Sequence, residues 1–323
     1  MAVENISFDI DPGCIYGFLG PNGAGKSTTM NIITGCLAAT EGTVTVDGKD
    51  IFENPTEAKA RIGYLPEIPP LYTEMTPYEY LFFVAEAKRV PASLRYSQVK
   101  EVIEVTGLED HADRLIKNLS KGFRQRVGIA QAMLGDPDVI ILDEPTVGLD
   151  PKQIIEIRDL IRELGKKKTV ILSSHILAEV ASVCDRIIII SGGRIVANDT
   201  IANIVKGDGA SYEIVFRVTP EKKPSILNSL STVEGSDITV EEAGDIITVE
   251  LKTNSTEDLR EYISDTVTSR GGKIVGLRRL SLSLEDVFLS LTSESIPISE
   301  YDDDDDEEED YTSLFNSEKG DEE

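Results

Sequence analysis

Cysteine is scarce in this 323-residue sequence, and long apolar runs are absent. Cys14, Cys36 and Cys184 lie far apart and form no CxxC pair, so the sequence predicts neither a disulfide framework nor a zinc site and is typical of a reducing cytosol. No apolar run approaches the roughly 18 residues that a membrane span needs. The N-terminus lacks the basic start and apolar stretch of a secretory signal. The sequence therefore predicts a chain that does not itself span a membrane.

Basic residues are outnumbered, and the excess negative charge is concentrated at one end. The formal net charge is -26, and residues 300–323 alone hold 14 acidic residues and one basic residue. So dense a block of like charge predicts a disordered segment, which we place at residues 293–323. Such a tail serves either as a solubilising extension or as a regulatory arm that binds basic surfaces or cations. The overall acidity argues against a nucleic-acid partner.

Residues 1–206 alternate short β-rich runs with helical patterns, which predicts an α/β domain with a parallel sheet. The expected strands are Ile15–Leu19, Arg61–Leu65, Val139–Leu142, Thr169–Ser173 and Arg186–Ile190. After a Gly-rich linker, residues 207–292 follow a β-α-β-β-α-β order, which predicts a small ferredoxin-like α+β domain that closes with a helix near Leu284–Leu291.

The segment GPNGAGKST after the first strand fits the phosphate-binding pattern GxxxxGK[ST] and opens a helical pattern. Its glycines let backbone N–H groups turn inward around phosphate oxygens, and the helix N-terminus adds partial positive charge. Lys26 is expected to bridge the β- and γ-phosphates, and Ser27 to ligate Mg²⁺. The residues expected to bind nucleotide here are Gly20, Pro21, Asn22, Gly23, Ala24, Gly25, Lys26, Ser27 and Thr28.

The segment VIILDEPTVGLD places two carboxylates at the end of a buried apolar strand. Asp143 is expected beside the Mg²⁺. Glu144 is expected to orient and partly deprotonate the water that attacks the γ-phosphate. A third segment, LSKGF at Leu119–Phe123, opens an amphipathic helix whose N-terminus can meet an anion.

Together these segments resemble the ATP-binding-cassette (ABC) family over roughly residues 3–200, and so identify a P-loop NTPase fold with a helical signature subdomain. GPNGAGKS looks like its Walker A motif, VIILDE its Walker B motif and LSKGF its signature motif. GLD, ending at Asp150, looks like its D-loop, and His175 like its switch histidine. IGYLPE, ending at Glu67, sits where the Q-loop belongs.

The resemblance implies an ATPase of two cooperating ATP-binding subunits, expected to be a homodimer. ATP on the Walker A motif of one copy would be covered by Ser120 and Gly122 of the other. Asp150 would join the two sites, and His175 would contact the γ-phosphate and act with Glu144 and Lys26 in catalysis. Separate membrane-spanning permease subunits would be the partners, with the chain peripheral at the cytoplasmic face of the membrane.

The sequence departs from the family pattern in three places. Glu67 replaces the usual Q-loop glutamine; it is still expected to face Mg²⁺, with altered electrostatics. Lys121 and Phe123 replace a glycine and a glutamine of the signature. Lys121 either adds a cation near the phosphates or points to solvent. The family's further N-terminal strand, with an aromatic residue that stacks on adenine, has no counterpart before Asn5. Either the true start of the chain lies further upstream, or adenine is bound more weakly.

The predicted function is therefore ATP hydrolysis that powers export through an ABC transporter. The ending SLSLEDVFLSLT and the segment Pro66–Leu81 are similar to exporter-type subunits of the gliding-motility and drug-export subgroup. Apolar and aromatic side chains in Pro66–Val84 form either a groove for a partner's helix or an ordinary helical core. The alternatives are a low-activity nucleotide sensor and a non-transport ABC ATPase that acts on DNA or ribosomes.

Overall fold

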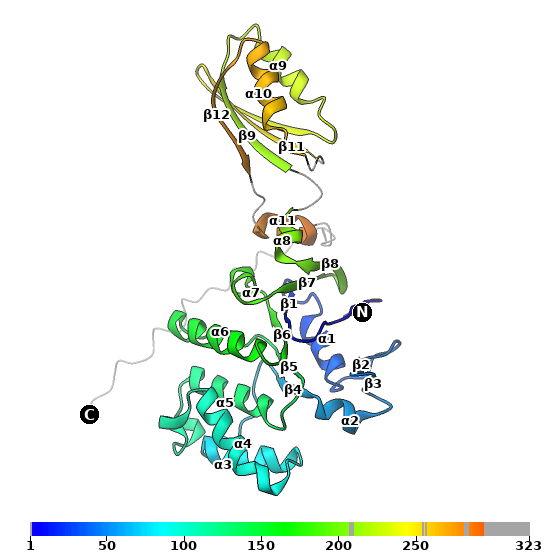
Figure 1. Cartoon of the computed structure of the whole chain (residues 1–323), viewed down its shortest axis with the longest axis vertical. Coiled ribbons are helices and arrows are strands. Elements are labelled where there is room, and N and C mark those ends of the chain that lie inside the picture. The colour runs from blue at the N-terminus through cyan, green and yellow to red at the C-terminus, as the bar shows by residue number, and fades with distance from the viewer. Residues whose placement is uncertain (1, 207–209, 254, 256, 281–283, 294–323) are drawn as a thin grey trace, which may run out of the picture.

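The computed structural model describes residues 2–206, 210–253, 255, 257–280 and 284–293. These residues form two units, each built on its own sheet (Figure 1). None of the described helices combines the length and apolarity needed to cross a bilayer. The predicted acidic tail beyond residue 293 lies outside the described residues, so its disorder stays a prediction.

The first unit holds a six-stranded sheet in the order β4-β5-β6-β1-β7-β8. All neighbouring strands are parallel except β7 and β8, which are antiparallel. In spatial order the strands are β4 (Ile62–Leu65), β5 (Val139–Leu142), β6 (Thr169–Ser174), β1 (Ile15–Leu19), β7 (Arg186–Ser191) and β8 (Arg194–Thr200). The five predicted strands are confirmed, and β8 is additional. Strand β1 is buried along its whole length, as expected for a continuously apolar central strand.

Helices cover both faces of this sheet, which makes the first unit a three-layer α/β structure (Figure 1). Because side chains alternate along a strand, Phe18 contributes to the core on one face and Leu19 to the core on the other. The surrounding elements are α1 (Lys26–Ile33), α2 (Pro55–Ala60), α6 (Pro151–Gly165), α7 (Leu177–Val183), α8 (Ile201–Lys206) and the short hairpin β2 (Thr45–Val46) and β3 (Lys49–Asp50).

A helical subdomain projects from the sheet between β4 and β5. It consists of α3 (Pro77–Ala87), α4 (Ala92–Val105) and α5 (Lys121–Met133), with 3₁₀ turns at Glu109–His111 and Ile116–Asn118. Its helices share a separate apolar core. Thr76 begins α3 with a capping box to Glu79, and Ser120 caps α5 by accepting from the Phe123 N–H. The predicted signature segment therefore does open a helix.

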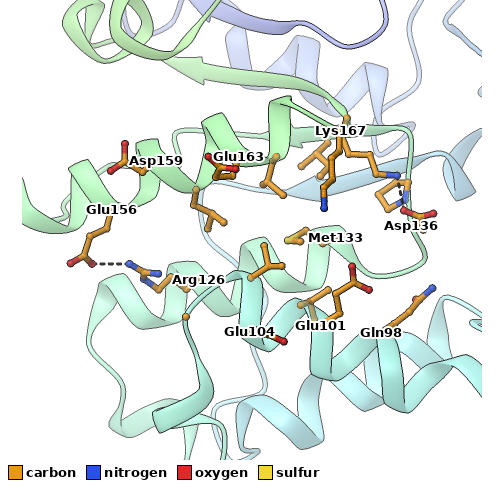
Figure 2. Close-up of a pocket in the computed structure, with 18 residues that line it drawn as sticks. Gln98, Glu101, Glu104, Arg126, Met133, Asp136, Glu156, Asp159, Glu163 and Lys167 are labelled. Atoms are coloured by element: carbon orange, nitrogen blue, oxygen red, sulfur yellow. Dashed lines mark hydrogen bonds and ion pairs between the residues drawn. The ribbon is translucent and has the colours of Figure 1, made fainter.

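A cleft of about 710 Å³ separates this subdomain from α6 (Figure 2). Arg126 of α5 crosses it: one guanidinium nitrogen lies 2.7 Å from the Glu156 carboxylate of α6, and another donates to the Thr106 carbonyl at 2.7 Å. Arg126 thereby ties the subdomain to the helix that follows the D-loop.

The second unit is a four-stranded antiparallel sheet in the order β10-β11-β9-β12, with two helices packed on it (Figure 1). Its elements are β9 (Ala210–Arg217), α9 (Lys223–Leu230), β10 (Asp237–Ala243), β11 (Ile246–Thr253), α10 (Arg260–Ser269) and β12 (Lys273–Leu280). Tyr212, Ile214 and Phe216 alternate along β9 toward the helices and are fully buried. The element order and strand order are those of the expected ferredoxin-like fold.

The last described helix, α11 (Leu284–Ser293), packs on the first unit. Its apolar residues Leu284, Val287, Phe288 and Leu291 lie against the core that also contains the inner faces of α6 and α7, and the helix contacts α8, β7 and β8. The sequence pattern predicted this helix as the end of the second domain, whereas in the structure it packs on the first unit. An amphipathic pattern shows which side of a helix is buried, but not against which core.

Candidate active site

The phosphate-binding segment joins the end of β1 to the start of α1, as predicted. Gly25 precedes α1 with a φ of 108°, and Gly23 has a φ of 79°. Glycine adopts such angles without steric cost, so the loop can turn its N–H groups inward. A Cβ built on Gly23 would meet no heavy atom within 4 Å, so there is open space beside the loop. Residues 20–25 thus form a loop and residues 26–28 the first turn of α1, so the segment contains a helix N-terminus, which suits a bound phosphate.

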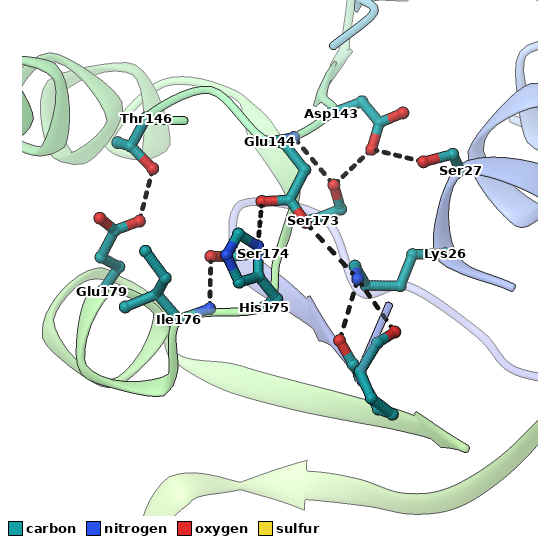
Figure 3. Close-up of polar contacts among 12 residues, drawn as sticks. Lys26, Ser27, Asp143, Glu144, Thr146, Ser173, Ser174, His175, Ile176 and Glu179 are labelled. Atoms are coloured by element: carbon teal, nitrogen blue, oxygen red, sulfur yellow. Dashed lines mark hydrogen bonds and ion pairs between the residues drawn. The ribbon is translucent and has the colours of Figure 1, made fainter. Parts of the chain in front are cut away.

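Lys26 is a buried cation at the first position of α1, directly after this loop. Its Nζ donates to the carbonyl of Gly20 at 2.9 Å and to that of Pro21 at 3.3 Å. It also lies 3.5 Å from Oε1 of Glu144, with both side chains more than nine-tenths buried. The ammonium is therefore held between the loop and the carboxylate at the end of β5 (Figure 3).

Asp143 connects β5 to α1 and to β6. Its Oδ1 accepts from the Ser27 hydroxyl at 3.4 Å and from the Ser173 hydroxyl at 2.5 Å. Asp143 is nearly completely buried, so each of these donors offsets part of the cost of removing its charge from water. The predicted Ser27–Asp143 pair lies together in the structure.

Glu144 has a left-handed backbone conformation with a φ of 47°. Its N–H donates to the Ser173 hydroxyl at 2.9 Å, and its Oε2 lies 3.0 Å from Nδ1 of His175. This conformation is uncommon for a residue other than glycine, and such strain is typical of active sites. The structure thus brings the buried Lys26 and Glu144 together with His175, whose side chain is 40% exposed (Figure 3).

Three further predicted site residues lie away from this cluster, two of them exposed and one, Gly122, buried. Ser120 and Asp150 are exposed N-caps of α5 and α6, and Gly122 lies in the first turn of α5. Among the described residues, no hydrogen bond or ion pair joins these three to the phosphate-binding loop. A Cβ built on Gly148 would meet Nζ of Lys121 at 2.2 Å, so the signature and D-loop segments lie side by side.

Glu67 follows β4 and is exposed. Within the described part of the chain it forms no hydrogen bond or ion pair with Ser27 or Asp143. Its predicted place at the metal therefore stays a prediction.

Three polar groups of the site were missed from the sequence. Ser173 bridges Asp143 and the N–H of Glu144, and the neighbouring serine-histidine pair was the signal for it. Thr146 donates to the buried Glu179 of α7 at 2.5 Å. Tyr64 of β4 donates to Oδ1 of Asn31 at 3.3 Å. Burial, and after it the charge of Asp143, raises the pKa of Tyr64, which keeps its hydroxyl protonated.

The oxygen ligands at the site suit a hard cation such as Mg²⁺. A hydroxyl and a carboxylate meet at Ser27 and Asp143, and Mg²⁺ is commonly held by one or two protein oxygens together with waters and substrate phosphates. Across the described ranges, no group of three or more His, Cys, Asp or Glu residues could hold a metal without such help. The residues present therefore fit Mg²⁺ bound together with a nucleotide.

Comparison with known proteins agrees with this geometry. The sequence profile described as ABC transporter matches residues 3–147. The chain is 34% identical over 300 residues to the uncharacterized ABC transporter ATP-binding protein YhcH of Bacillus subtilis, covering 91% of this chain and 92% of that protein. The chain belongs to the ABC transporter ATP-binding protein family.

Two further relatives carry names that refer to drug transport or resistance. The linearmycin resistance ATP-binding protein LnrL of Bacillus subtilis is 31% identical, covering 91% of this chain and 94% of that protein. The bacitracin transport ATP-binding protein BcrA of Bacillus licheniformis is 36% identical, covering 70% of this chain and 73% of that protein.

Solved ABC cassettes share the fold of the first unit. A dimeric, post-hydrolysis ATP-binding cassette, MJ0796 bound to ADP and Pi, superimposes with a TM-score of 0.57 and 28% identity, covering 62% of this chain and 90% of that one. This chain is accordingly an ATPase and the ATP-binding subunit of an ABC transporter, with a P-loop NTPase fold.

Proposed function

We propose that this chain powers export of a substrate through separate membrane-spanning subunits, with two copies closing on two ATP molecules. The observation that carries the proposal is the cluster of Lys26, Glu144 and His175 beside the phosphate-binding loop, in which the cation and the carboxylate are buried and the histidine is partly exposed. The names of LnrL and BcrA, which refer to antibiotic resistance and transport, support export. The chain would then lie peripherally at the cytoplasmic face of the membrane.

In this proposal each group of the site has a separate task. Residues Gly20–Thr28 bind the phosphates of ATP, and Lys26 neutralises charge on the β- and γ-phosphates. Glu144 orients the attacking water and accepts its proton. His175, which contacts the Glu144 carboxylate, fixes its direction and reaches the γ-phosphate. A general base placed in this way contributes typically about 10²- to 10⁴-fold in rate.

Mg²⁺ would be held by Ser27 and Asp143, with Glu67 as a further candidate ligand. When bound, it neutralises charge that develops on the phosphate oxygens. Removal of Mg²⁺ with a chelator should abolish hydrolysis.

The pairing of two copies would complete each site. Ser120 and Gly122 lie at the N-terminus of α5, where backbone N–H groups and partial positive charge favour an anion. Asp150 and the neighbouring Gly148 lie beside this signature segment through the contact with Lys121. We propose that this combined surface covers ATP bound by the partner copy; the similar cassette MJ0796, bound to ADP and Pi, is described as dimeric.

A surface beside β4 is the proposed docking site for a helix of the membrane subunit. Ile68, Tyr72 and Phe83 are 83%, 52% and 41% exposed. The rings of Tyr72 and Phe83 lie 5.3 Å apart between centroids, so they form a continuous apolar patch. Such patches on soluble proteins mark interaction sites. Tyr72→Ala and Phe83→Ala variants that stay folded should lose partner binding; full retention would refute this docking site.

The central test is ATP hydrolysis by the wild type and by Glu144→Gln. We expect Glu144→Gln to lower kcat by at least about 100-fold while ATP binding persists, since a general base is removed but the phosphate loop is kept. Equal, near-zero rates in both proteins would instead favour a nucleotide sensor. A gentle-detergent pull-down should recover a membrane protein of several spans; recovery of ribosomal or DNA-associated partners alone would refute the transport role.

A further inference from the structure

Glu179 is a buried carboxylate that the proposed reaction does not use. It lies on α7, four residues after His175, and is 7% exposed. The hydroxyl of Thr146, itself 4% exposed, donates to its Oε2 at 2.5 Å (Figure 3). Both groups thus find a partner in a place that water does not reach.

The bond involves the turn that follows the proposed base, because Thr146 is two residues after Glu144. Thr146 lies in the turn between Glu144 and the D-loop glycine, Gly148, and its carbonyl accepts from the N–H of Leu149 at 3.2 Å. The bond to Glu179 therefore fastens the middle of the segment that carries both the proposed base and the proposed dimer contact.

A second bond joins the same two segments. His175, just before α7, contacts the Glu144 carboxylate at 3.0 Å. The start of α7 is thus attached to residues 144–146 at two points, one through the side chain of the base and one through the turn behind it. A single contact at His175 would let residues 144–146 pivot about it. The second contact, between Thr146 and Glu179, opposes that rotation.

Stability alone does not account for a carboxylate here. Burying a charge in place of an apolar side chain is commonly neutral or destabilising, even when it is paired. The other neighbours of Glu179 on α7, Leu177 and Val180, belong to the apolar core.

We propose that the Glu179–Thr146 bond is a positioning device, which couples α7 and its switch histidine to the turn that orients Glu144. Neither residue has a hydrogen bond or ion pair with residues 20–28 in the described part of the chain; each acts through Glu144. This inference rests on the proposed roles of Glu144 and His175.

The test uses full-length protein and measures kcat and KM for Mg-ATP together with the thermal unfolding midpoint. Thr146→Val removes the hydroxyl at nearly constant volume, and we expect kcat to fall about 10-fold or more while KM stays within about twofold. Thr146→Ser keeps the hydroxyl and should restore kcat. The matched control is Thr106→Val, which removes a buried hydroxyl bonded to the Val102 carbonyl of α4; it should lower the midpoint and leave kcat unchanged.

The double variant Thr146→Val/Glu179→Leu separates positioning from stability. Thr146→Val alone leaves the Glu179 charge buried without its donor, so the unfolding midpoint should fall. In the double variant that charge is gone and the midpoint should recover, whereas kcat should stay low because the attachment is still missing. Recovery of kcat together with the midpoint would overturn the proposal.

Glu144→Gln is measured in the same assay. It distinguishes failure of the positioning role from failure of the proposed function. If it is inactive while Thr146→Val keeps the wild-type kcat, the positioning role is wrong and the proposed function stands. If Glu144→Gln keeps the wild-type rate, the proposed assignment of the base is itself wrong.

Discussion

Replacement of Ser173 by alanine should test how the site holds its two carboxylates. Ser173 is completely buried at the end of β6. Its hydroxyl donates to Asp143 at 2.5 Å and accepts from the N–H of Glu144 at 2.9 Å. Ser173→Ala removes one small group and both bonds, and leaves the surrounding apolar packing in place.

The expected cost follows from these two bonds. A hydrogen bond to a charged group contributes about 1.5–3 kcal/mol, and a buried N–H left without a partner costs about 1–3 kcal/mol. The two effects overlap, so we expect a loss of about 2–4 kcal/mol in the free energy of unfolding. For a unit of this size, 1 kcal/mol lowers the melting temperature by about 2–4 °C, so the midpoint should fall by at least about 4 °C.

The effect on catalysis should be separate from the effect on stability. The N–H bond to Ser173 supports the left-handed backbone of Glu144, which has a φ of 47°. Without it the carboxylate loses its fixed direction, and kcat should fall by about 10- to 100-fold at a temperature where the variant is fully folded. Steady-state hydrolysis of Mg-ATP and a thermal melt on the same samples measure both quantities.

Ser191→Ala is the matched control. Ser191 is buried at the end of β7, and its hydroxyl forms no hydrogen bond to the described residues. This variant should leave kcat unchanged. If Ser173→Ala lowers the midpoint and leaves kcat at the wild-type value, the hydroxyl stabilises the fold without orienting Glu144, and the reasoning is refuted.

Three further changes test the packing around the site. Phe288→Ala removes a ring of α11 from the core of the first unit and should lower the free energy of unfolding by about 1–3 kcal/mol. An unchanged thermal midpoint would contradict the packing of α11 on the first unit. Gly63→Ala would place a Cβ 2.1 Å from the carbonyl oxygen of Ala132. The free energy of unfolding measured in urea should therefore fall by at least about 2 kcal/mol. A fall below about 0.5 kcal/mol would refute this close approach. Arg126→Ala breaks the link across the cleft to Glu156, and amide exchange in α5 should accelerate relative to wild type; equal exchange rates would show that the link does not restrain the subdomain.

The parts of the fold that the sequence predicted are those determined by local pattern. β1 and β5 are continuous apolar runs, and such runs have few alternatives to a buried parallel strand. β8 was missed because its sequence, RIVANDT, is largely polar and its residues are half-exposed at the sheet edge. Gly192-Gly193, with φ values of 54° and 76°, was the available hairpin signal.

The contacts of the site depend on register between strands, which the sequence alone does not provide. Leu142 of β5 is paired with Leu172 of β6, so Asp143 and Ser173 follow as neighbours at the same edge. The phosphate loop and the two carboxylates could be recognised from their motifs. The bridging hydroxyl of Ser173 and the Thr146–Glu179 bond require the paired strands and α7 to be in place.

The packing of α11 has a consequence for the order in which the chain folds during synthesis. The first unit's core includes residues on both sides of the second unit, which lies between α8 and α11. At about 5–20 residues per second, the ribosome needs about 4–17 s to extend the chain from residue 206 to residue 293. The ferredoxin-like unit can therefore finish folding while the ATPase unit still exposes the surface that Val287 and Phe288 will cover. The ATPase unit is the first to begin synthesis and the last to be completed.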